Sequence, residues 1–278
     1  MKTKIIIDST TNVKPHLAEC FEVVPLTVHF GEEEYTDGVT ISHQQFYTML
    51  EQGDVVPTTS QPTPDAFAQM YQKVTDDGCE AVVITVASGL SGTYQSATIA
   101  AQDFEGRVFV VDSGSVAIGA GILAEIALEM ANQGKTAREI VHYLEQIKGR
   151  VKILAVLDTL EYLKKGGRVS RTVAFAGGLL SIKPVAVIEN GEIKMAGKAR
   201  GNKLGNAVML QQISGMGGID YTKPFILGYT GVTDTLLQEF VQDNADYFGD
   251  CQLHQSCVGS VVGTHAGPNA IAVAFVAG

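Results

Sequence analysis

The fold is indicated most clearly by residues 81–87, which read A-V-V-I-T-V-A, and by the small polar loop S-G-L-S-G-T that follows at 88–93. An unbroken run of β-branched and small apolar residues is typical of a strand buried on both faces, as in a parallel sheet. Similar runs occur at residues 4–8, 23–30 and 107–112. Together the four runs predict a parallel sheet in the first half of the chain.

Helical patterns lie between these runs. Ser42, Thr63 and Thr136 are each placed to cap a helix, and Glu139 stands three residues after Thr136, as in a capping box. Strands that alternate with helices predict an α/β layered N-terminal domain with right-handed crossovers.

The second half has a different pattern. Residues 183–188 and 193–200 are strand-like and are separated by a turn that contains Asn190 and Gly191, a pair typical of tight β-hairpins. Further strands are expected at 152–157, 225–229, 252–262 and 270–276, and helices at 202–214 and 233–248. The sequence therefore predicts a C-terminal α+β domain with a mixed or antiparallel sheet. The expected domains are residues 1–149 and 150–278.

The composition excludes several classes of protein. The 278 residues are 45% hydrophobic and 18% charged, which is enough apolar material for a full core and argues against disorder. No apolar run approaches the ~20 residues of a membrane-spanning helix. Asp8 ends the first apolar run too early for a signal peptide, so a cytoplasmic protein is expected. The four cysteines and six histidines lack metal-site spacing, and neither a metal nor a cofactor is expected.

The charge distribution restricts the classes of molecule that the protein can be expected to bind. A net charge of −10 argues against nucleic acid, yet residues 150–203 hold 11 basic and 4 acidic residues. A positive zone on an acidic chain is typical of an anionic ligand, an acidic partner or an anionic membrane surface. A solvated face whose charges find local partners is the alternative.

Small polar loops follow the predicted strands, at residues 8–12, 58–64, 88–93 and 112–115. Ligands of open α/β sheets bind outside the carboxyl ends of the strands, where loop hydroxyl and N–H groups can bind an anion. Ordinary turn and capping chemistry is the alternative for each loop taken alone.

A hydrolase is a second interpretation of the loop at 88–93. Ser91 lies between a predicted strand and helix, as in a G-x-S-x-G nucleophile elbow, and His265 lies far downstream. However, Thr93 occupies the position of the last glycine of that motif. A serine esterase or thioesterase that uses Ser91 and His265 therefore stays open as an alternative.

Taken together, five segments resemble the DegV family. They occur in the expected order, span nearly the whole chain, and read T-S-Q-P-T-P at 59–64, S-G-L-S-G-T-Y-Q-S-A at 88–97, D-S at 112–113, L-D-T-L-E-Y-L-K-K-G-G-R at 157–168 and G-T-H-A-G-P at 263–268. The resemblance implies a bacterial protein that encloses one long-chain fatty acid between two α/β domains, similar to the FakB subunit of fatty acid kinase. A separate kinase subunit would phosphorylate the exposed carboxylate, and the acyl phosphate would enter phospholipid synthesis.

The resemblance also assigns candidate residues. Thr59 and Ser91 would hold the carboxylate, with His265 close by and Arg168 near the head group. Four residues of the same loops are added as neighbours of the ligand: Ser60, Gly92, Thr93 and Ser113. On this interpretation the protein is a lipid carrier rather than an enzyme.

The expected binding energies fit a carrier. Each buried methylene contributes ~0.8 kcal/mol, so the acyl chain would supply most of the affinity and the hydroxyl groups would orient the carboxylate. Candidate walls are residues 116–130 and 174–182, for which plain core packing is the alternative. Lys164, Lys165, Arg168 and Arg171 are expected near the opening. Four further basic residues could dock the kinase subunit, touch anionic lipid or bind the partner of a lipid-sensing regulator: Lys194, Lys198, Arg200 and Lys203.

Overall fold

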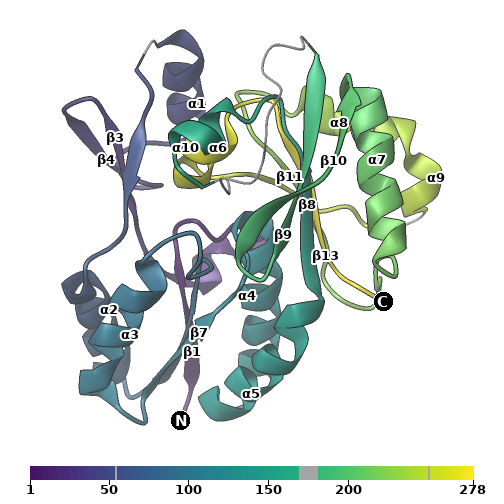
Figure 1. Cartoon of the computed structure of the whole chain (residues 1–278). Coiled ribbons are helices and arrows are strands. Elements are labelled where there is room, and N and C mark those ends of the chain that lie inside the picture. The colour runs from purple at the N-terminus through teal and green to yellow at the C-terminus, as the bar shows by residue number, and fades with distance from the viewer. Residues whose placement is uncertain (54, 169–180, 250) are drawn as a thin grey trace.

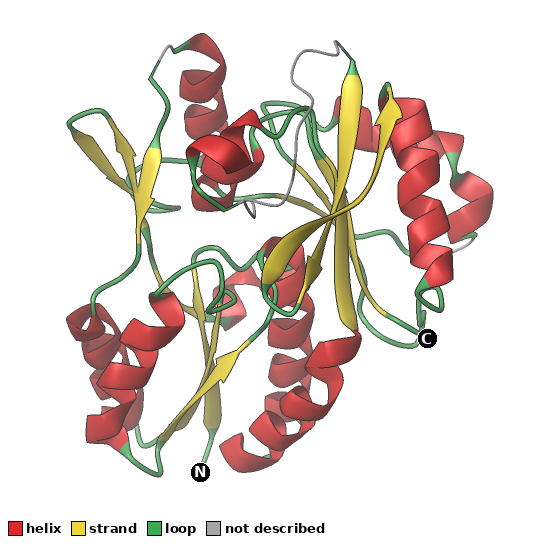
Figure 2. Cartoon of the chain, in the orientation of Figure 1, coloured by secondary structure: helices red, strands yellow, loops and turns green. Residues whose placement is uncertain are grey.

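The computed structural model describes residues 1–53, 55–168, 181–249 and 251–278. Its described strands form three sheets, and the predicted α/β architecture with a parallel and a mixed sheet is confirmed (Figure 1; Figure 2). The parallel sheet uses strands from residues 3–112 and the mixed sheet strands from residues 151–276. The proposed division at residue 149 therefore falls between the strands of the two large sheets.

The parallel sheet has the spatial order β2 (Glu22–Val24), β1 (Thr3–Asp8), β6 (Glu80–Thr85) and β7 (Val108–Asp112). Side chains alternate along its strands, so that Ile5 and Ile7 pack toward one layer of helices and Ile6 toward the other. The first layer is α4 (Ala117–Asn132) and α5 (Ala137–Ile147), and the second is α2 (Pro64–Asp76) and α3 (Thr93–Ala101). Both faces of this sheet are filled.

The predicted helix starts are confirmed. The Thr63 hydroxyl accepts from the Ala66 N–H at the start of α2, and Thr136 and Glu139 form a capping box at the start of α5. Ser42 forms a second capping box with Gln45 at the start of α1 (His43–Gln52). Three short 3₁₀ segments complete this half: η1 (Pro15–Cys20), η2 (Gln102–Phe104) and η3 (Lys148–Arg150).

The mixed sheet has six strands, in the spatial order β10 (Glu192–Arg200), β9 (Ile182–Glu189), β8 (Val151–Val156), β13 (Ile271–Val276), β11 (Ile226–Tyr229) and β12 (Gln255–Cys257). Neighbouring strands are antiparallel except for the parallel pair β11 and β12. The predicted hairpin joins β9 to β10 through Asn190 and Gly191, both of which have positive φ. Helices α7 (Asn202–Gly215), α8 (Thr235–Asp243) and α9 (Ala245–Phe248) cover one face.

A small antiparallel sheet corrects two predictions. It contains β4 (Glu33–Thr36), β3 (Thr27–Phe30) and β5 (Thr58–Ser60). The run at 23–30 is not one strand, because Pro25 lacks an N–H and the chain leaves the parallel sheet there. The segment at 58–64 is not wholly a loop, because its first three residues form the edge strand β5.

Two further predictions in the second half were wrong in extent. Residues 252–262 were expected to form a strand, but only β12 is extended, and helix α10 (Ser260–Ala266) begins after Gly259. The helix expected at 233–248 is divided at Asn244 into α8 and α9. Of the candidate wall at 174–182, residues 174–180 lie outside the described residues, as does Arg171.

Helices α4 and α10 connect the parts of the molecule. Helix α4 packs against β1 on one side and against β8, β11 and β13 on the other, which explains why it is buried around most of its circumference. Helix α10 lies between β12 and β13 of the mixed sheet in sequence, but its Val261 packs with β3 and α1 in the core of the small sheet. The carboxyl end of the parallel sheet, α10 and one face of the mixed sheet therefore meet around one space.

Candidate functional site

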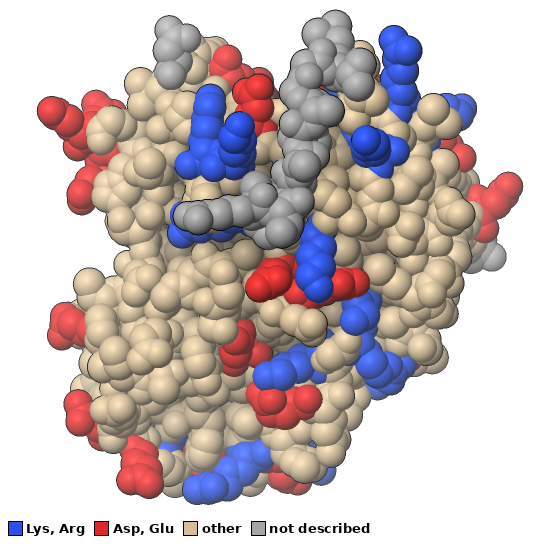
Figure 3. Space-filling view, viewed as in Figure 1, with Lys and Arg blue, Asp and Glu red and all other residues tan. Residues whose placement is uncertain are grey.

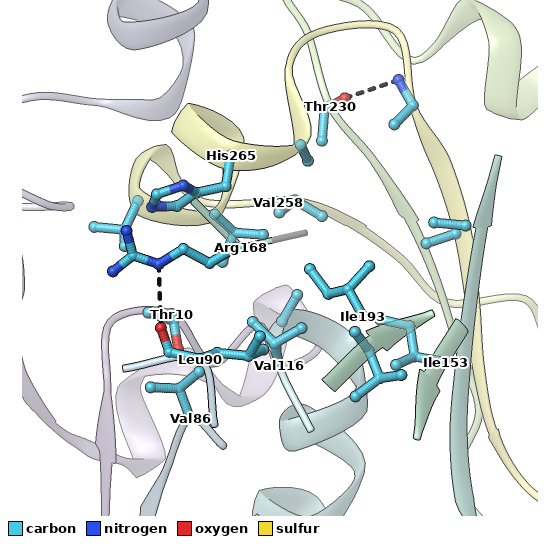
Figure 4. Close-up of a pocket in the computed structure, with 18 of the residues that line it drawn as sticks. Thr10, Val86, Leu90, Val116, Ile153, Arg168, Ile193, Thr230, Val258 and His265 are labelled. Atoms are coloured by element: carbon cyan, nitrogen blue, oxygen red, sulfur yellow. Dashed lines mark hydrogen bonds between the residues drawn. The ribbon is translucent and has the colours of Figure 1, made fainter. Parts of the chain in front are cut away.

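A cavity of about 400 Å³ lies where these elements meet (Figure 4). This volume is in the range of about 300–1,000 Å³ that is usual for small-molecule sites. One group of lining residues is polar: Thr10, Thr59, Ser60, Gln61, Ser91, Arg168 and His265. Most of the others are apolar and come from helices α4, α6 (Glu161–Lys165) and α10, from the mixed sheet and from the residues that flank these elements. They include Val116, Ile118, Ile153, Leu157, Leu163, Ile188, Ile193, Val258 and Val262.

The mixed sheet forms its side of the cavity with a row of small residues. Gly228 is paired with Ala272, Ala272 with Ala155, and Ala155 with Ala186, so the row crosses β11, β13, β8 and β9. All four residues line the cavity. Because each has at most a methyl group, the sheet leaves space at this face instead of filling it.

Thr59 and His265 are brought together from positions 206 residues apart. Thr59 lies on β5 and His265 in the last turn of α10, and the Thr59 Oγ1 to His265 Nε2 distance is 3.0 Å. Burial, together with the nearby positive charge of Arg168, lowers the pKa of His265 from 6.5 to about 4. The imidazole is therefore neutral at pH 7, with one nitrogen a donor and the other an acceptor.

Arg168 connects the two halves of the chain at the cavity. Its Nε donates to the Leu90 carbonyl oxygen at 3.2 Å, and its Nη1 donates to the Gly166 carbonyl oxygen at 2.6 Å. Leu90 belongs to the loop after β6, whereas Gly166 ends helix α6 (Glu161–Lys165). These bonds hold the guanidinium at the polar end of the cavity (Figure 4).

Ser91 is held by the turn that precedes α3. Its N–H donates to the Ala87 carbonyl oxygen, and its hydroxyl lies 2.9 Å from the Thr93 hydroxyl. Thr93 is buried, and neither it nor Gly92 lines the cavity, so the two support the loop from behind. Ser113, also expected near the ligand, does not line the cavity either, because it is buried with its hydroxyl donating to the Ser115 carbonyl oxygen.

Gln61 was not predicted as a site residue, although it stands within the T-S-Q-P motif. It lines the cavity, and its Nε2 donates to the Ser96 hydroxyl at 3.0 Å. A β-carbon at Gly92 would collide with the Gln61 amide group, so a larger residue there would displace Gln61 from this position. The neighbouring Ser60 also lines the cavity, and its hydroxyl lies 2.8 Å from His29 Nε2.

Asp8 also was not predicted as a site residue, beyond its place in a polar loop. It is fully buried, and its carboxylate accepts from the Thr10 N–H and hydroxyl and from the Val86 N–H. Burial raises the pKa of this carboxyl above its ordinary value of 3.8, against the hydrogen bonds that lower it. Because Thr10 and Val86 line the cavity, Asp8 fixes the part of the wall formed by the parallel sheet.

The arrangement lacks the hydrogen bonds of a serine hydrolase. A nucleophilic serine needs a bond to the base, and the base needs a third group that orients it. In the described part of the chain, the Ser91 hydroxyl is paired with Thr93 and not with His265, and His265 Nδ1 has no hydrogen-bond partner. Within the same residues, no three His, Cys, Asp or Glu side chains are grouped to bind a metal ion.

The basic residues predicted to dock a partner lie on and after the edge strand β10. Lys194, Lys198 and Arg200 are exposed along the strand, and Lys203 is exposed at the start of α7. Lys194 pairs with Glu189 at 3.2 Å, and Lys203 approaches Asp243 at 3.8 Å. Figure 3 shows basic side chains around α6, acidic and basic side chains together at the β9–β10 hairpin, and acidic ones over the outer edge of the small sheet. No helix in the described residues is long and apolar enough to cross a membrane.

Comparisons with known proteins agree over the full chain. The family model described as "Uncharacterised protein, DegV family" matches residues 2–278. A DegV domain-containing protein of Deinococcus radiodurans is 35% identical over 281 residues, which cover 99% of this chain and 98% of that protein. A fatty-acid-binding DegV family protein of Thermus thermophilus superimposes with a TM-score of 0.89 at 29% identity, covering 99% of this chain and 100% of that one. A DegV lipid-binding protein of Thermotoga maritima superimposes with a TM-score of 0.87 at 28% identity, covering 99% of this chain and 98% of that one. The chain therefore belongs to the DegV family.

Proposed function

We propose that this protein binds a long-chain fatty acid in the cavity and presents the carboxylate to a separate fatty acid kinase subunit. The observation that carries the proposal is that one cavity joins a cluster of hydrogen-bond donors to an apolar wall. The same ligand class is named for the DegV family protein of Thermus thermophilus. Acyl phosphate made by the kinase would then enter phospholipid synthesis in the bacterial cytoplasm.

The carboxylate would be bound by Thr59 and Ser91, with Arg168 and His265 beside them. With the neutral imidazole protonated on Nε2, His265 donates to Thr59 Oγ1 and leaves the threonine hydroxyl proton for the carboxylate. The Arg168 guanidinium offsets part of the cost of moving a carboxylate out of water. Two neutral hydroxyl groups and one nearby cation can fix the head group without the tight bidentate grip of an arginine fork.

The acyl chain would lie against the row of small residues on the mixed sheet. At ~0.8 kcal/mol per methylene, ten buried methylenes contribute roughly 8 kcal/mol before the costs of ordering the ligand. A hydrogen bond to a charged group contributes about 1.5–3 kcal/mol net. Affinity is therefore expected to depend mainly on the chain, and the position of the carboxylate on the polar residues.

The kinase subunit would dock beside the opening through the basic residues Lys194, Lys198, Arg200 and Lys203. Two of them, Lys198 and Arg200, form no ion pair with another described residue, which leaves their charge available to an acidic surface. Charged residues on an edge strand also discourage pairing with a second sheet, so these side chains can serve both purposes. The same residues could make a transient contact with anionic lipid.

Native mass spectrometry of the purified protein, with extraction and identification of any bound lipid, tests the proposal. We expect one fatty acid per chain, and uptake of added stearic acid after lipid removal. A delipidated protein that refuses stearic acid would contradict the binding function. Phosphorylation of the bound fatty acid by a cognate kinase subunit, and its loss in Lys198→Glu/Arg200→Glu with binding intact, tests the presentation step separately.

A further inference from the structure

Two short helices, α6 and α10, end side by side at the polar end of the cavity (Figure 1). Each is followed directly by a glycine, Gly166 after α6 and Gly267 after α10. A β-carbon at Gly267 would collide with the ring of Tyr162 on α6, and one at Gly166 would collide with the ring of His265 on α10. The two helices thus pack through a pair of reciprocal contacts between a glycine and a ring.

The two glycines differ in what their backbones require. Gly267 has φ of 73°, a left-handed conformation that favours glycine in any surroundings. Gly166 has φ of −76° and ψ of −7°, which is ordinary helical backbone that any residue adopts. The reason for a glycine at position 166 is therefore steric, because the space of its missing side chain is occupied by the His265 ring at Nδ1.

Gly166 also holds Arg168, through its main chain. Its carbonyl oxygen accepts from Arg168 Nη1 at 2.6 Å, while Arg168 Nε reaches across to the Leu90 carbonyl oxygen. One residue therefore contacts two side chains of the polar end, His265 through its Cα and Arg168 through its carbonyl group. Neither contact involves the ligand.

We propose that Gly166 is a positioning residue for the head-group site, which places the His265 ring against Thr59 and holds Arg168 beside it. The expected consequence, which is that the site discriminates a carboxylate from a neutral head group, rests on the proposed function. A methyl group at position 166 would occupy the space of the ring and displace it from its buried position beside Thr59 and Arg168. Fatty acid would then lose its preferred head-group contacts while the apolar wall stayed intact.

The test compares Gly166→Ala with Gly149→Ala in delipidated protein. Gly149 is the matched control, because it has no positive φ and a β-carbon added there would have no neighbouring atom within 4 Å. We expect the NMR titration of His265, assigned by its absence in His265→Ala, to move from a pKa of about 4 toward 6.5 in Gly166→Ala alone. We also expect the affinity ratio of stearic acid to stearyl alcohol to fall about tenfold, with alcohol binding unchanged.

A double variant keeps the test decisive. If Gly166 acts through His265, the change Gly166→Ala should not lower the melting temperature of His265→Ala, since the ring is already absent. This result supports the contact even where Gly166→Ala alone folds poorly. An unchanged His265 titration in Gly166→Ala, or an equal loss of stability with and without the ring, would overturn the inference. A wild-type protein that fails to prefer acid over alcohol contradicts the proposed function instead, and the titration still decides the role of Gly166.

Discussion

The two faces of the mixed sheet are built from the same strands and differ in how far their side chains fill the space above the sheet. One face carries the row Leu227, Val273, Leu154 and Val187, which packs with α7 and α8 into a filled core. The other face carries the neighbouring row Gly228, Ala272, Ala155 and Ala186, which lines the cavity. Because successive side chains of a strand point to opposite faces, stepping one residue along each strand changes a core into a cavity wall. The difference teaches that the cavity depends on side-chain volume and not on a gap between the secondary-structure elements.

The largest expected effect is on the filled face. Leu154→Ala removes a fully buried side chain from a packed cluster and should lower the free energy of unfolding by about 2–5 kcal/mol. Chemical denaturation monitored by circular dichroism measures this change. At low temperature, where the variant stays folded, its affinity for stearic acid should be close to that of the wild type. A stable Leu154→Ala would contradict the assignment of this face as the core.

A pH effect of similar size is expected at the polar end of the cavity. The folded protein keeps His265 neutral with a pKa of about 4, whereas the unfolded chain titrates near 6.5, so the unfolded state binds more protons between these values. Stability is therefore highest above pH 6.5 and falls as the pH drops toward 4, by roughly 3 kcal/mol from this group. Denaturation of delipidated wild type and His265→Gln at pH 7 and pH 4.5 isolates the contribution. A pH dependence that is the same in both proteins would show that the ring is not buried in its neutral form.

Ala155, the neighbour of Leu154 on the cavity face, should affect ligand binding more than stability. Ala155→Leu adds three carbons to the middle of the small-residue row, and filling the space of about three methylenes should weaken stearic acid binding by about 2 kcal/mol, or roughly thirtyfold. Stability should change less than in Leu154→Ala, since the added carbons enter an existing cavity. Competition with a fluorescent fatty acid measures the affinity, and a series of shorter acids should show that part of it returns. Undiminished binding of stearic acid would place the acyl chain elsewhere.

The smallest effect is expected at the hydroxyl groups. Ser91→Ala removes one donor to the carboxylate and should weaken stearic acid binding by about 1.5 kcal/mol, while phosphorylation by a cognate kinase subunit falls further because the carboxylate is less well oriented. Ser214→Ala is the matched control, because it deletes an exposed hydroxyl group on α7 that donates to the Leu210 carbonyl oxygen of the same helix. If both variants support equal phosphorylation, Ser91 does not hold the carboxylate. Hydrolysis of acyl esters that Ser91→Ala abolishes would favour the esterase alternative.

Most of the secondary structure could be predicted from the sequence, because local signals decide it. The apolar runs of β1, β6 and β7, the caps at Thr63 and Thr136, and the Asn190-Gly191 turn all occur as expected. The failures came where local patterns were ambiguous. Residues 23–30 look like one apolar run, but Pro25 divides them between two sheets. Residues after Gly259 are as apolar as a strand, yet they form α10, because a short apolar run fits a buried helix equally well.

The sequence by itself determined the parallel sheet and the hairpin. It also determined the motif residues, of which Thr59, Ser60, Ser91, Arg168 and His265 line one cavity. It could not determine the cavity. Ala155 and Ala186 read as ordinary strand residues until the strand register pairs them in one row with Ala272 and Gly228. Likewise Gly166 reads as a turn glycine until α10, from a distant part of the chain, places His265 against it. Local propensity is encoded within a few neighbouring residues, whereas empty space depends on the summed volumes of side chains that only the tertiary fold brings together.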